Sequence, residues 1–198
     1  MKMNEWFNFF KKYQTIKVFH INHIKVLTGL TEEHVRTSLS RLTKRQWLLR
    51  ICRNYYANPF NTPTLEEVSS IIHKPNYVSL ESALSLWGVL SQMPQILTCV
   101  TTNATYSLKT VLGSIEYRNI KPSLFFGFTK KNGYYLASAE KAILDYIYLN
   151  SALIKKGALH FDEWNLDSVN VKLLQSLAKK YNHPMTAQTI TFLLSSRA

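Results

Sequence analysis

Residues 20–58 read HINHIKVLTGL, TEEHVRTSLSRLTKRQ and WLLRICRNYYAN. This stretch decides the fold of the first third of the chain. Apolar residues at intervals of three predict a short helix that ends at Gly29, because glycine readily adopts the positive φ of a helix C-terminus. Thr31 can cap a second helix, since its hydroxyl can accept a hydrogen bond from a free N–H of the first turn. Residues typical of β-strands on both sides of Arg53-Asn54 predict a hairpin, because asparagine tolerates positive φ in a tight turn.

The second predicted helix has one apolar and one cationic side. Val35, Leu39 and Leu42 are spaced i, i+4 and i+7 and are expected to face the core. The opposite side combines small hydroxyls with long cations, and the cations continue onto both flanks. Small side chains let a helix approach a DNA groove while the cations reach phosphates or guanine edges. This surface comprises Thr37, Ser40, Arg41 and Lys44, with Arg36 and Arg45 on the flanks.

A cationic outer face is usually only a solvated helix surface. Here, however, the helix has no acidic residue beyond its first turn, and it lies between a first helix and a hairpin. That order is typical of a winged helix-turn-helix, in which the second helix reads the major groove of DNA. Strands at 47–51 and 55–58 would form the wing, from which Arg50 and Arg53 could touch the phosphate backbone or the minor groove. The alternative is a hairpin that only closes the domain.

The charge of the chain supports a polyanionic partner, either nucleic acid or an anionic membrane surface. Its net charge is +12 and its pI is near 9.7. Residues 1–60 contain 11 Lys and Arg against 3 Asp and Glu, a net of +8, whereas residues 61–198 contain 13 against 9, a net of +4. This asymmetry is typical of a nucleic-acid-binding module joined to a domain that is closer to neutral.

Membrane and secreted proteins are not favoured. No apolar run approaches the roughly 18 residues needed to span a bilayer, and the first residues lack the apolar segment of a signal peptide. Trp6, Phe9 and Phe10 recur at helical spacing, which predicts a first helix that packs its aromatic side inward. Cys52 and Cys99 are isolated from each other and from any metal-binding spacing. We therefore expect a cytoplasmic protein that does not contact membranes and holds no metal or cofactor.

The chain after residue 60 is expected to form a second part. Residues 61–75 are predicted to be a linker with a connecting helix, and residues 76–198 a mixed α/β domain with a helical tail. Ser79 and Ser138 can each cap a helix. Strands are expected at 97–102, 114–119, 124–129 and 134–136, and tail helices at about 166–181 and 186–196 with Pro184 between them. The predicted class is α+β, a winged helix-turn-helix followed by a mixed α/β domain.

Three residues could suggest an enzymatic role. Glu140, Lys141 and Asp145 are of the types that serve as active-site groups in nucleases. On a helix, however, Glu140 and Asp145 lie about 140° apart around the axis and do not share a face. A structural role, with Lys141 and Asp145 joining the helix to the sheet, is therefore preferred over catalysis.

A metal site is conceivable at His160, Asp162 and Glu163. These residues alternate in a predicted loop, and no second histidine cluster accompanies them, so the pattern is weak. The sequence has no glycine-rich phosphate loop and no nucleophile motif of the hydrolase type. No catalytic residues are expected.

Several segments of the second part resemble the AbiEi family of antitoxins, which belong to type IV toxin–antitoxin (abortive infection) systems. The most specific is Ala137–Asp145, which is similar to the family's Ala-x-x-Glu-Lys-Ala-aliphatic-aliphatic-Asp helix. The resemblance covers roughly residues 15–150. It departs from the family at the Arg53-Asn54 turn, where a glycine is expected. The other matching segments are Tyr77-Val78-Ser79, Ser82-Ala83-Leu84, Trp87-Gly88-Val89-Leu90, Val100-Thr101-Thr102, Leu27-Thr28-Gly29-Leu30 and Trp47-Leu48-Leu49-Arg50.

The resemblance implies a cytoplasmic, DNA-binding autorepressor that binds double-stranded DNA at inverted repeats in its own promoter. It also implies that the protein counteracts a nucleotidyltransferase-like toxin, AbiEii, encoded by a neighbouring gene, without forming a stable complex with that toxin. The N-terminal domain would bind DNA, and the C-terminal part would be needed for neutralisation. The alternative is a stand-alone winged-helix transcription factor whose second domain senses a ligand.

Overall fold

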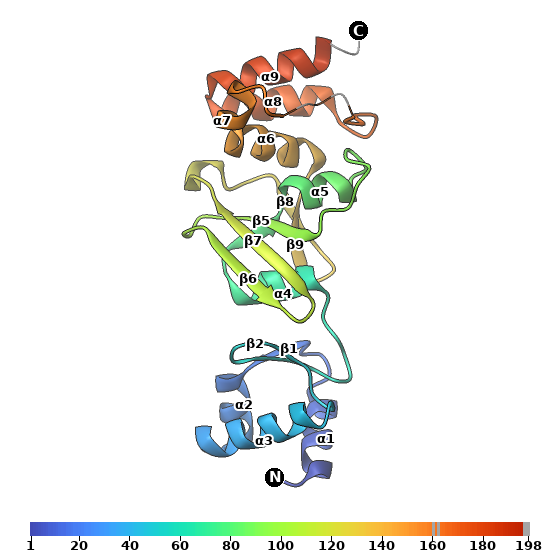
Figure 1. Ribbon diagram of the computed structural model, residues 1–198, viewed down its shortest axis with the longest axis vertical. Helices are drawn as coiled ribbons and strands as arrows, with labels where there is room; N and C mark the ends of the chain where they lie inside the picture. The colour runs from blue at the N-terminus through green and yellow to red at the C-terminus, as the bar shows by residue number, and fades with distance from the viewer. Residues whose placement is uncertain (160, 162, 196–198) are drawn as a thin grey trace.

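The computed structural model describes residues 1–159, 161 and 163–195 (Figure 1). It is an α+β structure, in which helices with a small three-stranded sheet are followed by a six-stranded mixed sheet and C-terminal helices. Figure 1 shows an elongated molecule with α1, α2 and α3 at one end and the C-terminal helices at the other. The α+β class predicted from the sequence is confirmed.

The N-terminal part consists of three helices and a small antiparallel sheet with strand order β1-β3-β2. Its elements are α1 (Met3–Lys12), β1 (Val18–His20), α2 (Ile21–Thr28), α3 (Glu32–Lys44), β2 (Arg50–Cys52) and β3 (Tyr55–Ala57). Trp6, Phe10 and Phe19 are at most 2% exposed and belong to one aromatic-rich core that joins α1 to the sheet. The inward packing predicted for the aromatic side of the first helix is confirmed.

Local chemistry sets the ends of the two helices that follow β1. Gly29 adopts a φ of +67°, and its N–H donates to the carbonyl of Lys25 at 3.0 Å, which ends α2. The hydroxyl of Thr31 accepts from the N–H of His34 at 3.4 Å, which starts α3. Both ends lie where the sequence predicted them.

The hairpin is shorter than predicted. The strand expected at 47–51 begins only at Arg50, because a turn that includes Gln46 at a φ of +58° follows α3. Asn54 has a φ of +67° whereas Arg53 does not have positive φ, so the turn is not of type I′, which requires positive φ at both central residues. Asparagine thus occupies the one position where glycine would otherwise be favoured.

The second part is built on a sheet with strand order β6-β7-β5-β4-β9-β8. Two neighbouring pairs, β4–β9 and β5–β7, are parallel, and the other three pairs are antiparallel. Its elements as far as the sheet extends are α4 (Leu65–Ile72), β4 (Asn76–Val78), α5 (Leu80–Leu86), β5 (Ile96–Thr101), β6 (Tyr106–Thr110), β7 (Gly113–Asn119), the 3-10 helix η1 (Pro122–Leu124), β8 (Phe128–Lys131) and β9 (Tyr134–Ala137).

The structure has two strands that the sequence did not predict, and one predicted strand starts at the wrong place. Neither β4 nor β6 was expected, because β4 has only three residues and β6 is a largely polar edge strand. The strand expected at 124–129 is wrong at its start. Proline begins the 3-10 helix η1, and Gly127, with a φ of +74°, separates that helix from β8.

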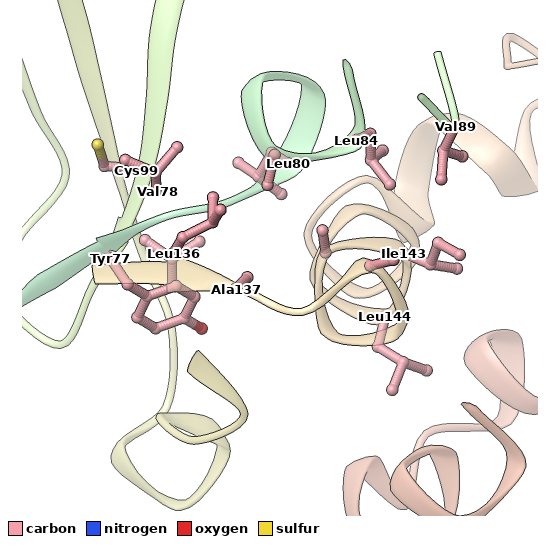
Figure 2. Packing of buried hydrophobic residues seen from close by; sticks show 14 of the residues in the cluster. Tyr77, Val78, Leu80, Leu84, Val89, Cys99, Leu136, Ala137, Ile143 and Leu144 are labelled. Carbon is pink, nitrogen blue, oxygen red and sulfur yellow. The ribbon is translucent and has the colours of Figure 1, made fainter. Parts of the chain in front are cut away.

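In the described residues, four helices follow β9, and α6 contacts α5, α8 and α9. They are α6 (Ala139–Leu149), α7 (Ser151–Lys155), α8 (Val171–Tyr181) and α9 (Pro184–Ser195). The helix α7 was not expected, and α8 begins later than predicted. Pro184 does not separate two helices but is the first residue of α9, where its missing N–H is harmless. Figure 2 shows side chains from β4, α5, β9 and α6 packed together in the core of the second part.

The two parts of the chain share a boundary that the sequence did not indicate. Val18, Ile51 and Ala57 of the small sheet pack in the same hydrophobic cluster as the second part. The N–H of Val111, in the β6–β7 turn, donates to the carbonyl of Ile51 at 3.2 Å. The helix α4, expected to be a connecting helix, packs against β4, β5, β7 and β9. The hairpin is therefore held from one side by the second part.

The side chain of Asn58, just after β3, fastens the chain to α1. It is fully buried, and its Nδ2 donates to the carbonyls of Phe10, Tyr13 and Ile16 at 3.2, 3.0 and 3.0 Å. We expect Asn58→Ala to lower the free energy of unfolding in urea by about 2–3 kcal/mol, because it removes three hydrogen bonds to these carbonyls and the acceptor of the Phe60 N–H. The matched control is Asn61→Ala, which loses one exposed bond and should cost less than about 1 kcal/mol. Equal losses in the two variants would contradict this role.

Candidate nucleic-acid interface

The helix α3 presents the surface that the sequence singled out. Val35, Leu39 and Leu42 are buried, as predicted. In Figure 1, α3 lies at the end of the molecule that is far from the C-terminal helices. All eight predicted DNA-binding residues are exposed, namely Arg36, Thr37, Ser40, Arg41, Lys44, Arg45, Arg50 and Arg53.

The centre of this surface is free to meet a partner. In the part of the chain that the structure describes, Thr37, Ser40 and Lys44 have side chains that make no hydrogen bond to another residue and no ion pair. The two hydroxyls are short, so the backbone of α3 can approach a groove closely at these positions. Lys44 adds a mobile cation at the C-terminal end of the helix, where it also complements the helix dipole.

Arg36 connects α3 to the hairpin turn. Its guanidinium bonds the carboxylate of Glu32 one turn earlier, with Nε at 2.9 Å and the second terminal nitrogen at 2.7 Å. Its remaining terminal nitrogen donates to the side-chain oxygen of Asn54 at 3.3 Å. The hydrogen bond from Arg36, together with its charge, lowers the pKa of the Glu32 carboxyl. The structure thus places the turn, with exposed Arg53, beside the first half of α3.

Arg41 and Arg45 lie on the opposite flank of α3, toward α1. Both line a pocket of about 280 Å³ together with Lys2 and Trp6 of the N-terminal segment. The sequence placed Arg45 on a flank, but it gave no sign that the start of α1 would lie beside it. Because Lys2 and Trp6 are at least 35 residues from Arg41 and Arg45 in the chain, only the folded core brings them to this surface.

Arg50 is the predicted site residue with the weakest connection to α3. It lies on the edge strand β2, and its Nε donates to the carbonyl of Cys52 at 3.4 Å, next to an irregularity in the β2–β3 register. Within the described residues, no hydrogen bond or ion pair joins Arg50 to α3. The next residue, Ile51, is the one that contacts Val111 of the second part. Arg53 is therefore better placed than Arg50 to share a ligand with α3.

The Lys141–Asp145 pair lies at the centre of the second part. Asp145 is completely buried and accepts four hydrogen bonds. Two reach its Oδ2, from Tyr77 at 2.9 Å and Ser79 at 2.8 Å, and two reach its Oδ1, from Lys141 and Tyr181 at 2.5 Å each. One carboxylate therefore joins β4, α6 and α8. We call these five residues the Asp145 network.

The Asp145 network corrects one prediction and clarifies another. Ser79 precedes α5, but its hydroxyl bonds Asp145 and makes no cap, because a buried carboxylate needs donors more than the helix end does. Glu140 faces elsewhere, and its Oε1 accepts from the N–H of Asn170 at 2.8 Å. As predicted, Glu140 and Asp145 do not share a face.

The structure describes only part of the segment that could suggest a metal site. His160 and Asp162, two of the three residues weighed for a metal site, lie outside the described residues. Among the described residues, no group of three or more His, Cys, Asp or Glu side chains is placed to hold a metal ion. Likewise, no helix in the described residues is long and apolar enough to cross a membrane.

The Asp145 network leads to a prediction about alkaline pH. Burial, followed by the charge of Asp145, raises the pKa of Tyr77 and Tyr181 above the ordinary value of about 10. Folded protein therefore keeps protons that the unfolded chain loses above pH 10, so the stability that these groups contribute is present below pH 10 and is lost as the pH rises further. These two tyrosines alone should lower the free energy of unfolding by up to about 3 kcal/mol per pH unit above that point. Tyr117 adds to the fall, because burial raises its pKa as well.

Lys141 acts in the other direction but over a different range. Burial lowers its pKa, against the opposing effect of Asp145, so its contribution rises with pH only until the unfolded lysine deprotonates near pH 10.5. Urea midpoints measured at pH 9, 10 and 11 test the prediction, with the sharpest fall expected above 10.5. Tyr181→Phe should reduce the slope, whereas Tyr135→Phe, at an exposed position, should not. A urea midpoint at pH 11 that is no lower than the midpoint at pH 10 would refute it.

Comparison with known proteins adds no family to these observations. The sequence matches no protein-family model, and no curated protein matches it. The likeness of residues 77–145 to the AbiEi antitoxins thus stays a prediction from the sequence, and the functional argument depends on the surface of α3.

Proposed function

We propose that this protein is a DNA-binding transcriptional autorepressor and a type IV antitoxin of the AbiEi kind. One observation carries the proposal: α3 follows a helix and a tight turn and exposes Thr37, Ser40, Arg41 and Lys44 with no acidic residue among them. Such a surface suits entry into the major groove of double-stranded DNA. In this reading the three-stranded sheet completes a winged helix-turn-helix, and Arg53 and Arg36 contact the backbone beside the groove.

The antitoxin half of the proposal is supported by the residues that carry the resemblance. Tyr77, Ser79, Lys141 and Asp145 come from segments quoted separately for that resemblance, and they meet in one buried network. Members of a family share a fold, so residues that build its core are expected among the family's characteristic motifs. The protein would act in the cytoplasm, repress its promoter at inverted repeats and counteract a nucleotidyltransferase toxin without a stable complex.

A gel-shift titration tests the DNA-binding half. The full chain should shift a duplex that carries the sequence upstream of its own gene at concentrations well below those needed for an unrelated duplex of equal length. The observed association constant should fall steeply with salt, because each phosphate neutralised contributes a slope of about −0.9 to the logarithmic plot. Equal affinity for both duplexes would remove the assignment of a sequence-specific repressor.

Co-expression tests the antitoxin half independently. The neighbouring gene is expressed in cells with and without this chain, and growth is scored. Growth arrest by the neighbour alone, relieved by this chain, is the expected result. The control places the neighbour under a promoter that lacks the operator, so that relief cannot come from repression of toxin synthesis. A neighbour that never affects growth would reject the antitoxin role and leave the DNA-binding role standing.

One observation favours the second candidate, a stand-alone transcription factor that senses a ligand. A cavity of about 600 Å³ lies between α8 and α9, and Lys179, His183 and Ile190 are among the residues that line it. Its size and its mixed polar and apolar lining are in the range of small-molecule sites. A neighbouring gene without toxin character, together with operator affinity that depends on a small molecule, would favour this candidate.

A further inference from the structure

The pocket between α1 and α3 has features that the recognition surface alone does not explain. Its volume is about 280 Å³, and it lies where the first turn of α1 meets the second half of α3. Figure 1 shows the start of α1 at the same end of the molecule as α3. Its lining includes the side chains of Lys2, Trp6, Ser38, Arg41 and Arg45.

Charge around this pocket is strongly positive. Lys2, Arg41 and Arg45 line it, and none of the three forms an ion pair within the described residues. Glu5 is not among the lining residues. Its carboxylate accepts the backbone N–H of Lys2 at 2.8 Å and lies 4.0 Å from the N-terminal ammonium of Met1, which does line the pocket. Three unpaired cations around one small cavity would repel one another unless an anion enters.

Trp6, one of the residues that line the pocket, carries a buried donor without a partner among the described residues. Trp6 is 2% exposed, and its indole Nε1–H makes no hydrogen bond to any residue that the structure describes. The indole can only donate, so it needs an acceptor, and unsatisfied buried donors are uncommon. Met3, in the first turn of the ten-residue helix α1, also lines the pocket, so the positive end of a helix dipole lies beside it. Cations and donors therefore surround the pocket, and an oxyanion would satisfy both.

We propose that this pocket binds a phosphate of the DNA backbone beside the groove that α3 enters. Arg45 and Lys2 supply the charge, and the Trp6 indole donates to a phosphate oxygen. The inference rests on the proposed DNA-binding function and extends it, because it adds Lys2 and Trp6 to an interface that otherwise consists of α3 and the hairpin turn. Contact with the backbone at this point fixes the register of α3 without reading sequence.

A matched pair of substitutions in α1 tests the charge. Lys2→Ala removes a cation from the pocket, and Lys11→Ala removes an exposed cation from the last turn of the same helix. Association constants for the operator duplex are measured from 50 to 200 mM salt. For Lys2→Ala we expect a salt slope about 0.9 shallower than wild type, and for Lys11→Ala an unchanged slope. Equal slopes in wild type and Lys2→Ala would overturn the proposal.

Trp6→Phe tests the donor, since phenylalanine keeps the aromatic packing but has no N–H. We expect operator affinity about tenfold lower at an unchanged salt slope. In wild type, the Trp6 indole resonance, assigned through this variant, should shift on adding the duplex. A Trp6 resonance of the wild-type protein that stays in place when the duplex is bound would overturn the proposal.

Two further outcomes separate the possible causes of failure. If inorganic phosphate alone shifts the Trp6 resonance at submillimolar concentration and the duplex does not, the pocket is a site for a small free anion, and the assignment to DNA is overturned. If wild type binds no duplex at all, the proposed function itself fails. A protein that binds the operator normally but shows no effect of Lys2→Ala or Trp6→Phe rejects only the pocket.

Discussion

Replacing Asp145 by alanine is expected to lower the free energy of unfolding by about 3–5 kcal/mol, the largest loss of any single substitution considered for this protein. The variant leaves Lys141 fully buried, with the hydroxyl of Tyr181 as its remaining polar partner. It also leaves the hydroxyls of Tyr77 and Ser79 without their acceptor. A buried ammonium without a counter-ion is costly because the surrounding side chains cannot replace water. Urea unfolding followed by circular dichroism measures the loss.

A double-mutant cycle separates the missing charge from the missing volume. Asp145→Asn keeps the shape of the side chain but removes its charge, and it should be nearly as destabilising as alanine. Adding Lys141→Met to Asp145→Asn removes the remaining buried charge and should recover part of the lost stability, because an apolar replacement of a buried pair is often tolerated. If the double variant is less stable than Asp145→Asn by the full cost of Lys141→Met alone, the two side chains are not coupled and the network has been misread.

Local patterns explain why the N-terminal part could be predicted well. The apolar spacing of Val35, Leu39 and Leu42 determines which side of α3 is buried, so the exposed side follows directly from it. Gly29 and Thr31 set the helix ends through bonds that span only three or four residues. These short-range interactions depend only on residues that are close in the sequence. The exposure of the predicted DNA-binding residues depends on little else.

Contacts between distant segments explain what could not be predicted. Ser79 has the composition and position of a helix cap, and its true partner, Asp145, is 66 residues away. The edge strand β6 has little apolar alternation and is defined by its pairing with β7. The contact between the β6–β7 turn and Ile51 of the hairpin therefore could not be predicted either. Lys2 and Trp6 joined the candidate interface for the same reason, since only tertiary packing sets α1 beside α3.

The surface of α3 leads to the second large effect. Arg41→Ala combined with Lys44→Ala should weaken binding to the operator duplex by about 30- to 1000-fold, or roughly 2–4 kcal/mol, because two cations that reach phosphates or guanine edges are lost together. The salt slope should become shallower by about 0.9 for each of the two that contacts a phosphate. Both residues are exposed, so the free energy of unfolding should change little.

A control of equal charge decides whether the effect belongs to α3 or to net charge. Lys11→Ala with Lys12→Ala removes the same two positive charges from exposed positions at the C-terminal end of α1. If long-range attraction were all that mattered, the two double variants would lose affinity equally. A recognition helix predicts instead that the α3 variant loses at least tenfold more, and that it loses more for the operator than for an unrelated duplex, because base contacts disappear only where bases are read. Equal losses would place the DNA-binding surface away from α3, and Thr37 and Ser40 would then be ordinary solvated residues.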